Sequence, residues 1–183
     1  DWVAVSFVRS LEDVRYARAY MDEVGSNAPM MAKLERSEAV ENVDEILSEV
    51  DGVMVARGDL GVEIDMVEVP VIQKNIVAGA KQAAKVSVIA TQMLRSMVVS
   101  PTPTRAEVSD ISNAVLDGCD AILLSDETAV GQFPVEALSV AARTISKSEE
   151  IYPYYQDLSE DNRTQAIASG AARLVRSLGA KPV

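Results

Sequence analysis

The stretch that decides the fold is an apolar run ending in polar residues, Gly52-Val53-Met54-Val55-Ala56-Arg57-Gly58-Asp59-Leu60-Gly61. Its first half is small or apolar at every position, which is typical of a parallel strand covered on both faces. Its second half carries two glycines, which allow a ligand to approach the backbone, and its N–H groups could hold a carboxylate or a phosphate. A turn with a capping aspartate would leave the same pattern, so the other strand ends must decide between the two interpretations.

Four more apolar runs resemble this one, at Val3–Val8, Met30–Leu34, Val86–Ala90 and Ala121–Leu124. The centres of successive runs lie about 22 to 34 residues apart, which is the spacing of a strand followed by a crossover helix. Helices are expected to begin after Ser10, Ser37, Asp65 and Thr104, and a further one is expected to contain Val135–Ile145. Ser10 is placed as an N-cap, and Thr104 with Glu107 matches the T-x-x-E capping box.

Five parallel strands with right-handed crossovers form part of either an open doubly wound sheet or a (β/α)8 barrel. The G-x-G-x-x-G fingerprint of dinucleotide-binding sheets is absent from the sequence, and so is the G-x-x-x-x-G-K-[ST] phosphate loop. Polar residues follow the strands directly, where the active sites of barrels are built. We therefore favour an α/β fold of the (β/α)8 TIM barrel type, although five strands cannot close a barrel.

The composition excludes several classes of function. The chain has 183 residues, with 28 Asp and Glu against 17 Lys and Arg, and its net charge of −11 argues against a nucleic-acid partner. No apolar run approaches the roughly 20 residues of a membrane span, and the start lacks a signal peptide, so we expect no membrane partner and a cytoplasmic location. The single cysteine, Cys119, fits a reducing compartment and is expected to be a small core residue. The absence of histidine removes Ser–His and Cys–His nucleophile pairs, which leaves carboxylates, lysines, hydroxyls and hard cations for chemistry.

The candidate site lies at the ends of the predicted strands. Lys33 and Glu35 are two positions apart at the end of one strand, so alternation sends both side chains to the same side. Asp59 could join Glu35 as a ligand of a hard cation, because Mg²⁺ usually takes one or two carboxylates together with substrate oxygens. A structural ion pair and a capping aspartate remain the alternatives. Ser6 and Thr91 follow other strands, where isolated hydroxyls are more often helix caps than catalytic groups.

Several motifs in the sequence closely resemble those of the pyruvate kinase family. The resemblance is carried in the family's order by residues 31–40 (MAKLERSEAV), 51–63 (DGVMVARGDLGVE), 90–94 (ATQML), 103–107 (PTRAE) and 113–118 (NAVLDG), and it covers about residues 1–150. It implies a (β/α)8 TIM barrel of which this chain holds about the fourth to eighth strand–helix units. Residues 1–152 would be the partial catalytic barrel. Residues 153–183 would be a connector, including the polar stretch Ser159–Arg163, and the first helix of an α/β C-terminal regulatory domain.

The resemblance also implies the reaction, phosphoryl transfer from phosphoenolpyruvate to ADP giving pyruvate and ATP. Lys33 and Thr91 would be catalytic, and phosphoenolpyruvate would contact both of them together with the backbone of Gly58 and Asp59. Glu35 and Asp59 would hold Mg²⁺ or Mn²⁺, and Ser6 would lie near a K⁺ site. The family is usually a tetramer, so a homo-oligomer is expected. An incomplete barrel of this kind would be inactive alone.

Four positions depart from the family's usual residues, namely Arg36, Arg95, Asp126 and Val130. They put nucleotide handling and interface details in question more than the metal pair. Two other interpretations stay open at this stage. One is a metal-dependent barrel lyase acting on pyruvate or its enolate, and the other is a truncated, non-catalytic paralogue that serves as an interaction module.

Overall fold

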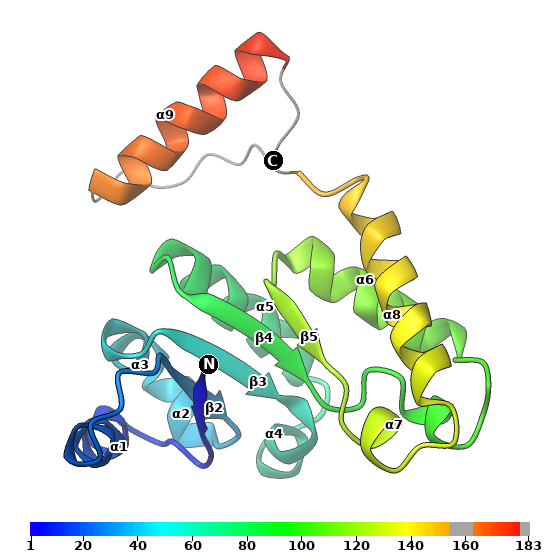
Figure 1. Cartoon of the computed structure of the whole chain (residues 1–183), viewed down its shortest axis with the longest axis horizontal. Coiled ribbons are helices and arrows are strands. Elements are labelled where there is room, and N and C mark those ends of the chain that lie inside the picture. The colour runs from blue at the N-terminus through cyan, green and yellow to red at the C-terminus, as the bar shows by residue number, and fades with distance from the viewer. Residues whose placement is uncertain (154–162, 180–183) are drawn as a thin grey trace.

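The computed structural model describes residues 1–153 and 163–179. Its centre is one parallel sheet of five strands, β1 (Val3–Val5), β2 (Met30–Leu34), β3 (Gly52–Ala56), β4 (Val86–Ala90) and β5 (Ala121–Leu123). The strands lie in the order β1-β2-β3-β4-β5, so each pairs with the next one along the chain (Figure 1). This order matches consecutive units of a barrel, whereas a doubly wound sheet reverses its strand order at a switch point. The predicted parallel α/β fold is confirmed, as part of a TIM barrel.

The helices connect the strands in the expected alternation. They are α1 (Leu11–Glu23), α2 (Ser37–Glu41), α3 (Val43–Glu49), α4 (Arg57–Glu63), α5 (Val69–Gln82), the 3₁₀ helix η1 (Arg95–Val98), α6 (Arg105–Asp117), α7 (Asp126–Ala129), α8 (Pro134–Glu149) and α9 (Arg163–Leu178). Both predicted caps are confirmed. Ser10 and Asp13 form a capping box at the start of α1, and Thr104 and Glu107 form another at the start of α6.

Three local predictions were wrong. The helix expected to begin after Asp65 begins only at Val69, as α5. The single helix expected after Ser37 is broken at Asn42 into α2 and α3, and the Asn42 side chain donates a hydrogen bond to the Arg9 carbonyl at 3.0 Å. The first strand ends at Val5 rather than Val8, and two residues later Phe7 has a φ of 58°. A strand cannot continue through that left-handed conformation.

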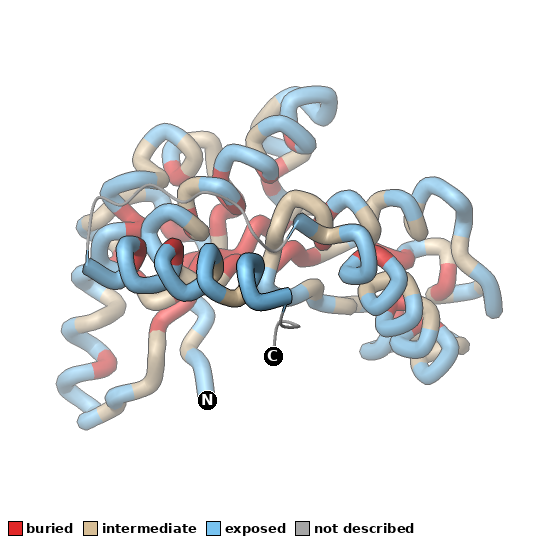
Figure 2. The backbone as a smooth tube through the Cα atoms, turned by 90° about the horizontal axis from the view of Figure 1, so that it is seen from above, coloured by how far each residue is buried: buried red, intermediate tan, exposed pale blue. Residues whose placement is uncertain are grey.

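The two faces of the sheet pack differently because successive side chains point to opposite sides. One face meets the helices, and there Leu34, Val55 and Ile89 join a large core with Ile46 of α3 and Ile76 of α5. Each of these side chains is at most 1% exposed, and burial of such a side chain contributes about 1.5–3 kcal/mol. The other face carries a smaller cluster of Met31, Met54, Val88 and Ala90. Figure 2 shows the buried segments running through the middle of the molecule, with exposed helix surfaces around them.

The end of the chain is described only in part. Residues 154–162 and 180–183, which include most of the predicted connector, lie outside the described residues. The predicted helix over 164–178 is confirmed as α9, and the side chain of Gln165 donates a hydrogen bond to the backbone carbonyl of Gln82 at the end of α5. Within the described ranges, the structure holds no helix long and apolar enough to cross a membrane.

Candidate functional site

The first part of the site comes from the end of β2. The Nζ atom of Lys33 lies 2.6 Å from Oε1 of Glu35, so the predicted convergence of the two side chains on one side is confirmed. The Glu35 side chain is 1% exposed, whereas that of Lys33 is 26% exposed. The carboxylate is therefore buried beneath an ammonium group that still reaches solvent.

The loop after β1 completes this cluster. The ammonium of Lys33 also donates a hydrogen bond to Oγ of Ser6 at 3.0 Å. The backbone N–H of Phe7 donates to Oε2 of Glu35 at 2.9 Å, and Phe7 itself has a φ of 58°. The structure thus brings together three residues expected from the sequence, Ser6, Lys33 and Glu35, and Phe7 adds an anchor that the sequence analysis missed.

The second part of the site joins α4 to the end of β4. The N–H of Gly58 lies in the first turn of α4, where it has no partner within the helix, and it donates instead to Oγ1 of Thr91 at 2.7 Å. The Thr91 hydroxyl in turn donates to the carbonyl of Ala90 at 2.6 Å. A Cβ atom at position 58 would lie 3.3 Å from that hydroxyl oxygen, which is tighter than ordinary contact. Glycine at position 58 therefore permits the close approach, and Thr91 is not a helix cap.

Asp59 stands beside this pair with an exposed side chain. Among the residues that the structure describes, its carboxylate has no hydrogen-bond or ion-pair partner. No group of three or more Asp, Glu or Cys residues in the described part is arranged to hold a metal ion. A site for Mg²⁺ or Mn²⁺ needs fewer protein ligands, because these ions take one or two carboxylates and complete their shell with substrate oxygens and water. The donor chemistry of Glu35 and Asp59 fits such an ion.

Two charged residues with little exposed surface were not assigned a role from the sequence. Glu127, at 1% exposure, accepts hydrogen bonds from the N–H of Leu94 at 2.9 Å and the N–H of Ser125 at 2.8 Å, so it joins the loops after β4 and β5. The side chain of Arg57, 11% exposed, leaves α4 and pairs with Asp110 of α6. The only feature of the sequence that could have pointed to these two residues is their position, because each follows a strand of the sheet within a few residues.

The departures from the family pattern are partly paired with one another. Arg95 forms an ion pair with Asp126, both on the surface, so the additional negative charge at position 126 has a local counterion. Arg36 pairs with Glu63 at the end of α4, and its guanidinium lies 5.2 Å from the centre of the Phe7 ring. Val130 is exposed.

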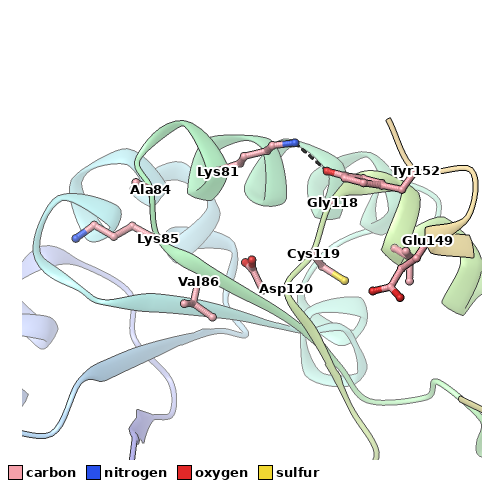
Figure 3. A pocket seen from close by; sticks show the side chains of 10 residues that line it. Lys81, Ala84, Lys85, Val86, Gly118, Cys119, Asp120, Glu149 and Tyr152 are labelled. Carbon is pink, nitrogen blue, oxygen red and sulfur yellow. Dashed lines mark hydrogen bonds between the residues drawn. The ribbon is translucent and has the colours of Figure 1, made fainter. Parts of the chain in front are cut away.

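A separate cavity of about 470 Å³ lies at the opposite ends of the strands (Figure 3). It is bordered by Lys81, Lys85 and Asp120, and by Tyr152, whose hydroxyl accepts a hydrogen bond from Lys81 at 2.8 Å. Cys119 also lines it, and burial, followed by the charges of Asp120 and Asp117, raises the pKa of the Cys119 thiol to about 12. A neutral, half-buried thiol of this kind matches the expected packing role rather than a nucleophile.

The chain is similar to known proteins in both sequence and structure. A family model described as "Pyruvate kinase, barrel domain" matches residues 1–138. The chain is 44% identical to pyruvate kinase 2 of Synechocystis, with all of this chain and 31% of that protein covered. It is 48% identical to a pyruvate kinase of Mycobacterium tuberculosis, with 94% of this chain and 37% of that protein covered.

A solved structure gives the same result. The crystal structure of a pyruvate kinase from Cryptosporidium parvum matches with a TM-score of 0.91 and 40% identity, and the match covers 99% of this chain and 40% of that one. The chain thus spans between 31% and 40% of the length of these three proteins.

Proposed function

This chain belongs to the pyruvate kinase family, and we propose that the protein it comes from transfers the phosphoryl group of phosphoenolpyruvate to ADP, giving pyruvate and ATP. The observation that carries the proposal is the convergence of Lys33 on a buried Glu35 at the end of β2, with the Gly58–Thr91 pair directly after the next two strands, β3 and β4. Phosphoenolpyruvate is small and highly charged, so the protein groups that bind it must lie close together. Lys33, Glu35 and the Gly58–Thr91 pair all lie at the carboxyl ends of consecutive strands, where barrel active sites are built, and this position supports a role in binding the substrate.

Lys33 is proposed to act through a fixed positive charge. Its ammonium is held by Glu35 and Ser6, so it is already oriented before substrate arrives. A preorganised cation stabilises charge that develops on the transferring phosphoryl group and on the enolate oxygen without having to reorganise during the reaction. The 26% exposure of its side chain leaves the ammonium accessible to a substrate.

Glu35 and Asp59 are proposed to hold the divalent cation, Mg²⁺ or Mn²⁺. When bound, such an ion offsets the charge on substrate oxygens during phosphoryl transfer. Glu35 is rigid because both of its oxygens already have partners, while Asp59 is exposed and without a partner in the described part of the chain. Ser6 is proposed to lie beside a K⁺ site, where its hydroxyl oxygen would serve as a neighbouring acceptor.

Gly58, Asp59 and Thr91 are proposed to bind the substrate's carboxylate. The N–H groups of Gly58 and Asp59 lie in the first turn of α4, where helix geometry provides no acceptor for them. The Gly58 N–H donates to the hydroxyl of Thr91 in this structure, so a bound carboxylate would take over that N–H and lie beside the Thr91 hydroxyl. Thr91 is further proposed to assist protonation of the enolate carbon through a water molecule.

The proposal also covers the oligomeric state, the domain division, the partners and the location of the protein. A homo-oligomer is supported by exposed apolar side chains around the start of α5, namely Val62, Met66, Val67 and Val71, each at least 60% exposed. We further propose a partial catalytic barrel over residues 1–152 and the start of a C-terminal domain over 153–183. The net charge of −11 supports the absence of a nucleic-acid partner, and we propose a cytoplasmic location without a membrane partner.

The test is a coupled assay on the complete gene product. With phosphoenolpyruvate, ADP, K⁺ and Mg²⁺ we expect pyruvate and ATP to form in equal amounts, and we expect no appreciable turnover from the 183-residue chain alone. Cleavage of a pyruvate aldol without nucleotide dependence would instead establish the lyase. Absence of both activities in a well-folded complete product would establish the non-catalytic module.

A further inference from the structure

We propose that Arg57 is a positioning residue that holds Thr91 in its working conformation. The inference rests on the proposed function and deepens it, because it concerns the same carboxylate-binding group. Arg57 is the first residue of α4, yet its guanidinium turns away from solvent and contacts three other elements. A helix can begin without a charged, largely buried side chain at its first position, so formation of α4 does not explain why Arg57 is there.

The guanidinium is held at one end by α5 and α6. Its Nη1 atom lies 2.7 Å from a carboxylate oxygen of Asp110 in α6 and donates a longer hydrogen bond of 3.4 Å to Oε1 of Gln73 in α5. The Nε atom is buried without a hydrogen-bond partner among the described residues. A buried guanidinium with one unpaired donor is costly, so stability alone accounts poorly for an arginine here.

The other end of the guanidinium holds the loop after β4. Its Nη2 atom donates to the carbonyl oxygen of Thr91 at 2.9 Å and also contacts Sδ of Met93 at 2.8 Å. Thr91 has a φ of 70°, and the next residue, Gln92, has a φ of 56°. Left-handed backbone is unfavourable for a β-branched residue and persists only where the surroundings enforce it.

Two consecutive residues therefore hold two different oxygen atoms of Thr91. Arg57 holds its carbonyl oxygen through a side chain, and Gly58 holds its hydroxyl oxygen through a backbone N–H. Loss of the Arg57 contact would free Thr91 to relax toward an ordinary φ, which would swing its hydroxyl away from the Gly58 amide. The guanidinium fork suits this role because its two ends can hold Asp110 and Thr91 at once, which an ammonium cannot do.

The test measures catalysis by the complete protein with Arg57→Ala and with Arg57→Lys, which keeps a cation against Asp110 if Arg57→Ala fails to fold. We expect Arg57→Lys to lower kcat/KM for phosphoenolpyruvate by about tenfold and Arg57→Ala by about a hundredfold, since small displacements of a positioning group have effects of this size. The KM for ADP should stay within about twofold of wild type. Arg15→Ala is the matched control, because Arg15 is 63% exposed and pairs with Glu49 far from the site, and it should leave all constants unchanged.

A double-mutant cycle with Thr91→Ala decides whether Arg57 acts through Thr91. We expect Arg57→Lys to add little to the loss already caused by Thr91→Ala, because both would remove the same function. Multiplicative losses, or an equal rise in the KM of both substrates, would overturn the proposal.

Hydrogen exchange of the amides in residues 88–94 gives a readout independent of turnover, so that failure of the proposed function can be told apart from failure of this one. Exchange should be faster in Arg57→Lys than in wild type whether or not the protein is a kinase. Unchanged exchange in this segment would overturn the positioning role even if the kinase activity of wild type is established.

Discussion

The ammonium of Lys33 lies 2.6 Å from Oε1 of Glu35 while the other carboxylate oxygen, Oε2, accepts the N–H of Phe7 at 2.9 Å. The two oxygens of one buried side chain thus orient a cation and fix the loop after β1. Because Glu35 is 1% exposed, its charge depends on these partners for stabilisation. Lys33 and Glu35 are therefore tested by separate substitutions with separate measurements.

Replacing Lys33 by Met in the complete protein should remove phosphoryl transfer while leaving metal binding largely intact. The expected loss of kcat is about a hundredfold to a thousandfold, typical of removing a charge that stabilises the transition state. Glu35 and Asp59 remain, so Mn²⁺ titrated by calorimetry should bind with nearly unchanged affinity. Lys147→Met, at a 77% exposed position, is the control and should have no effect. An unchanged kcat in Lys33→Met would refute the role given to Lys33.

Replacing Glu35 by Gln should have the complementary effect. The amide oxygen can still accept the N–H of Phe7, so the loop after β1 should stay in place. The lost charge should weaken Mn²⁺ binding by about tenfold or more, since hard cations prefer carboxylate oxygens. Calorimetric titration of the complete protein measures this, and equal Mn²⁺ affinities in variant and wild type would remove Glu35 from the metal site.

Glu127→Gln is the matched control for that experiment. Glu127 is equally buried, but its oxygens accept the backbone N–H groups of Leu94 and Ser125 rather than a lysine. A glutamine can satisfy only one of the two donors, so unfolding in urea should show a loss of about 1–3 kcal/mol with no change in Mn²⁺ affinity. A metal defect in this variant as large as that of Glu35→Gln would show that neither result reports on ligation.

The carboxylate of Glu107 should contribute stability that depends on pH. Burial raises the pKa of this carboxyl, but hydrogen bonds from Ser96 and Thr104 outweigh burial and hold the pKa below its usual value of 4.5. Because the folded pKa is the lower one, the contribution is present above pH 4.5 and is lost as the pH falls through the folded pKa.

Glu107→Gln should therefore lower the free energy of unfolding by about 1–2 kcal/mol at pH 7. The difference from wild type should shrink as acid protonates the wild-type carboxyl. Urea unfolding between neutral pH and pH 3 measures it, and a difference that is constant over this range would contradict the prediction.

The thiol of Cys119 should resist modification in the native protein. Its pKa is raised to about 12, chiefly by burial, so the reactive thiolate is scarce at pH 8. Ellman's reagent should label it slowly in buffer and rapidly in guanidinium chloride. Rapid labelling of the native protein would show that the thiol is both accessible and ionised.

Replacing Met66 by Glu should weaken self-association. Met66 is 74% exposed within the apolar patch near the start of α5, and a charge buried between two copies would be strongly unfavourable. Sedimentation of the complete protein should show a smaller species in the variant. Tyr16→Glu, at a 69% exposed position of α1, is the control that should leave the assembly unchanged. An intact oligomer in Met66→Glu would place the interface elsewhere.

Local residue patterns were enough to predict the strands, the capped helices and the gathering of polar groups at one end of the sheet. Those features depend on residues close together in the chain. Alternation sends Lys33 and Glu35 to one side of β2, and the two residues of the Thr104–Glu107 capping box are only three positions apart. The motifs also pointed to the family, because their order along the chain is itself sequence information.

Tertiary structure alone decided how the site is held together. The Arg57–Asp110 pair spans 53 residues, the Gly58–Thr91 bond 33 and the Phe7–Glu35 bond 28. Local preference was also insufficient at α4, where the two glycines were compatible with a turn, yet a helix forms and packs Leu60 fully into the core. Burial of that side chain and contacts between distant strand ends outweigh the weak local preference of a short segment, and they exist only once the sheet has assembled.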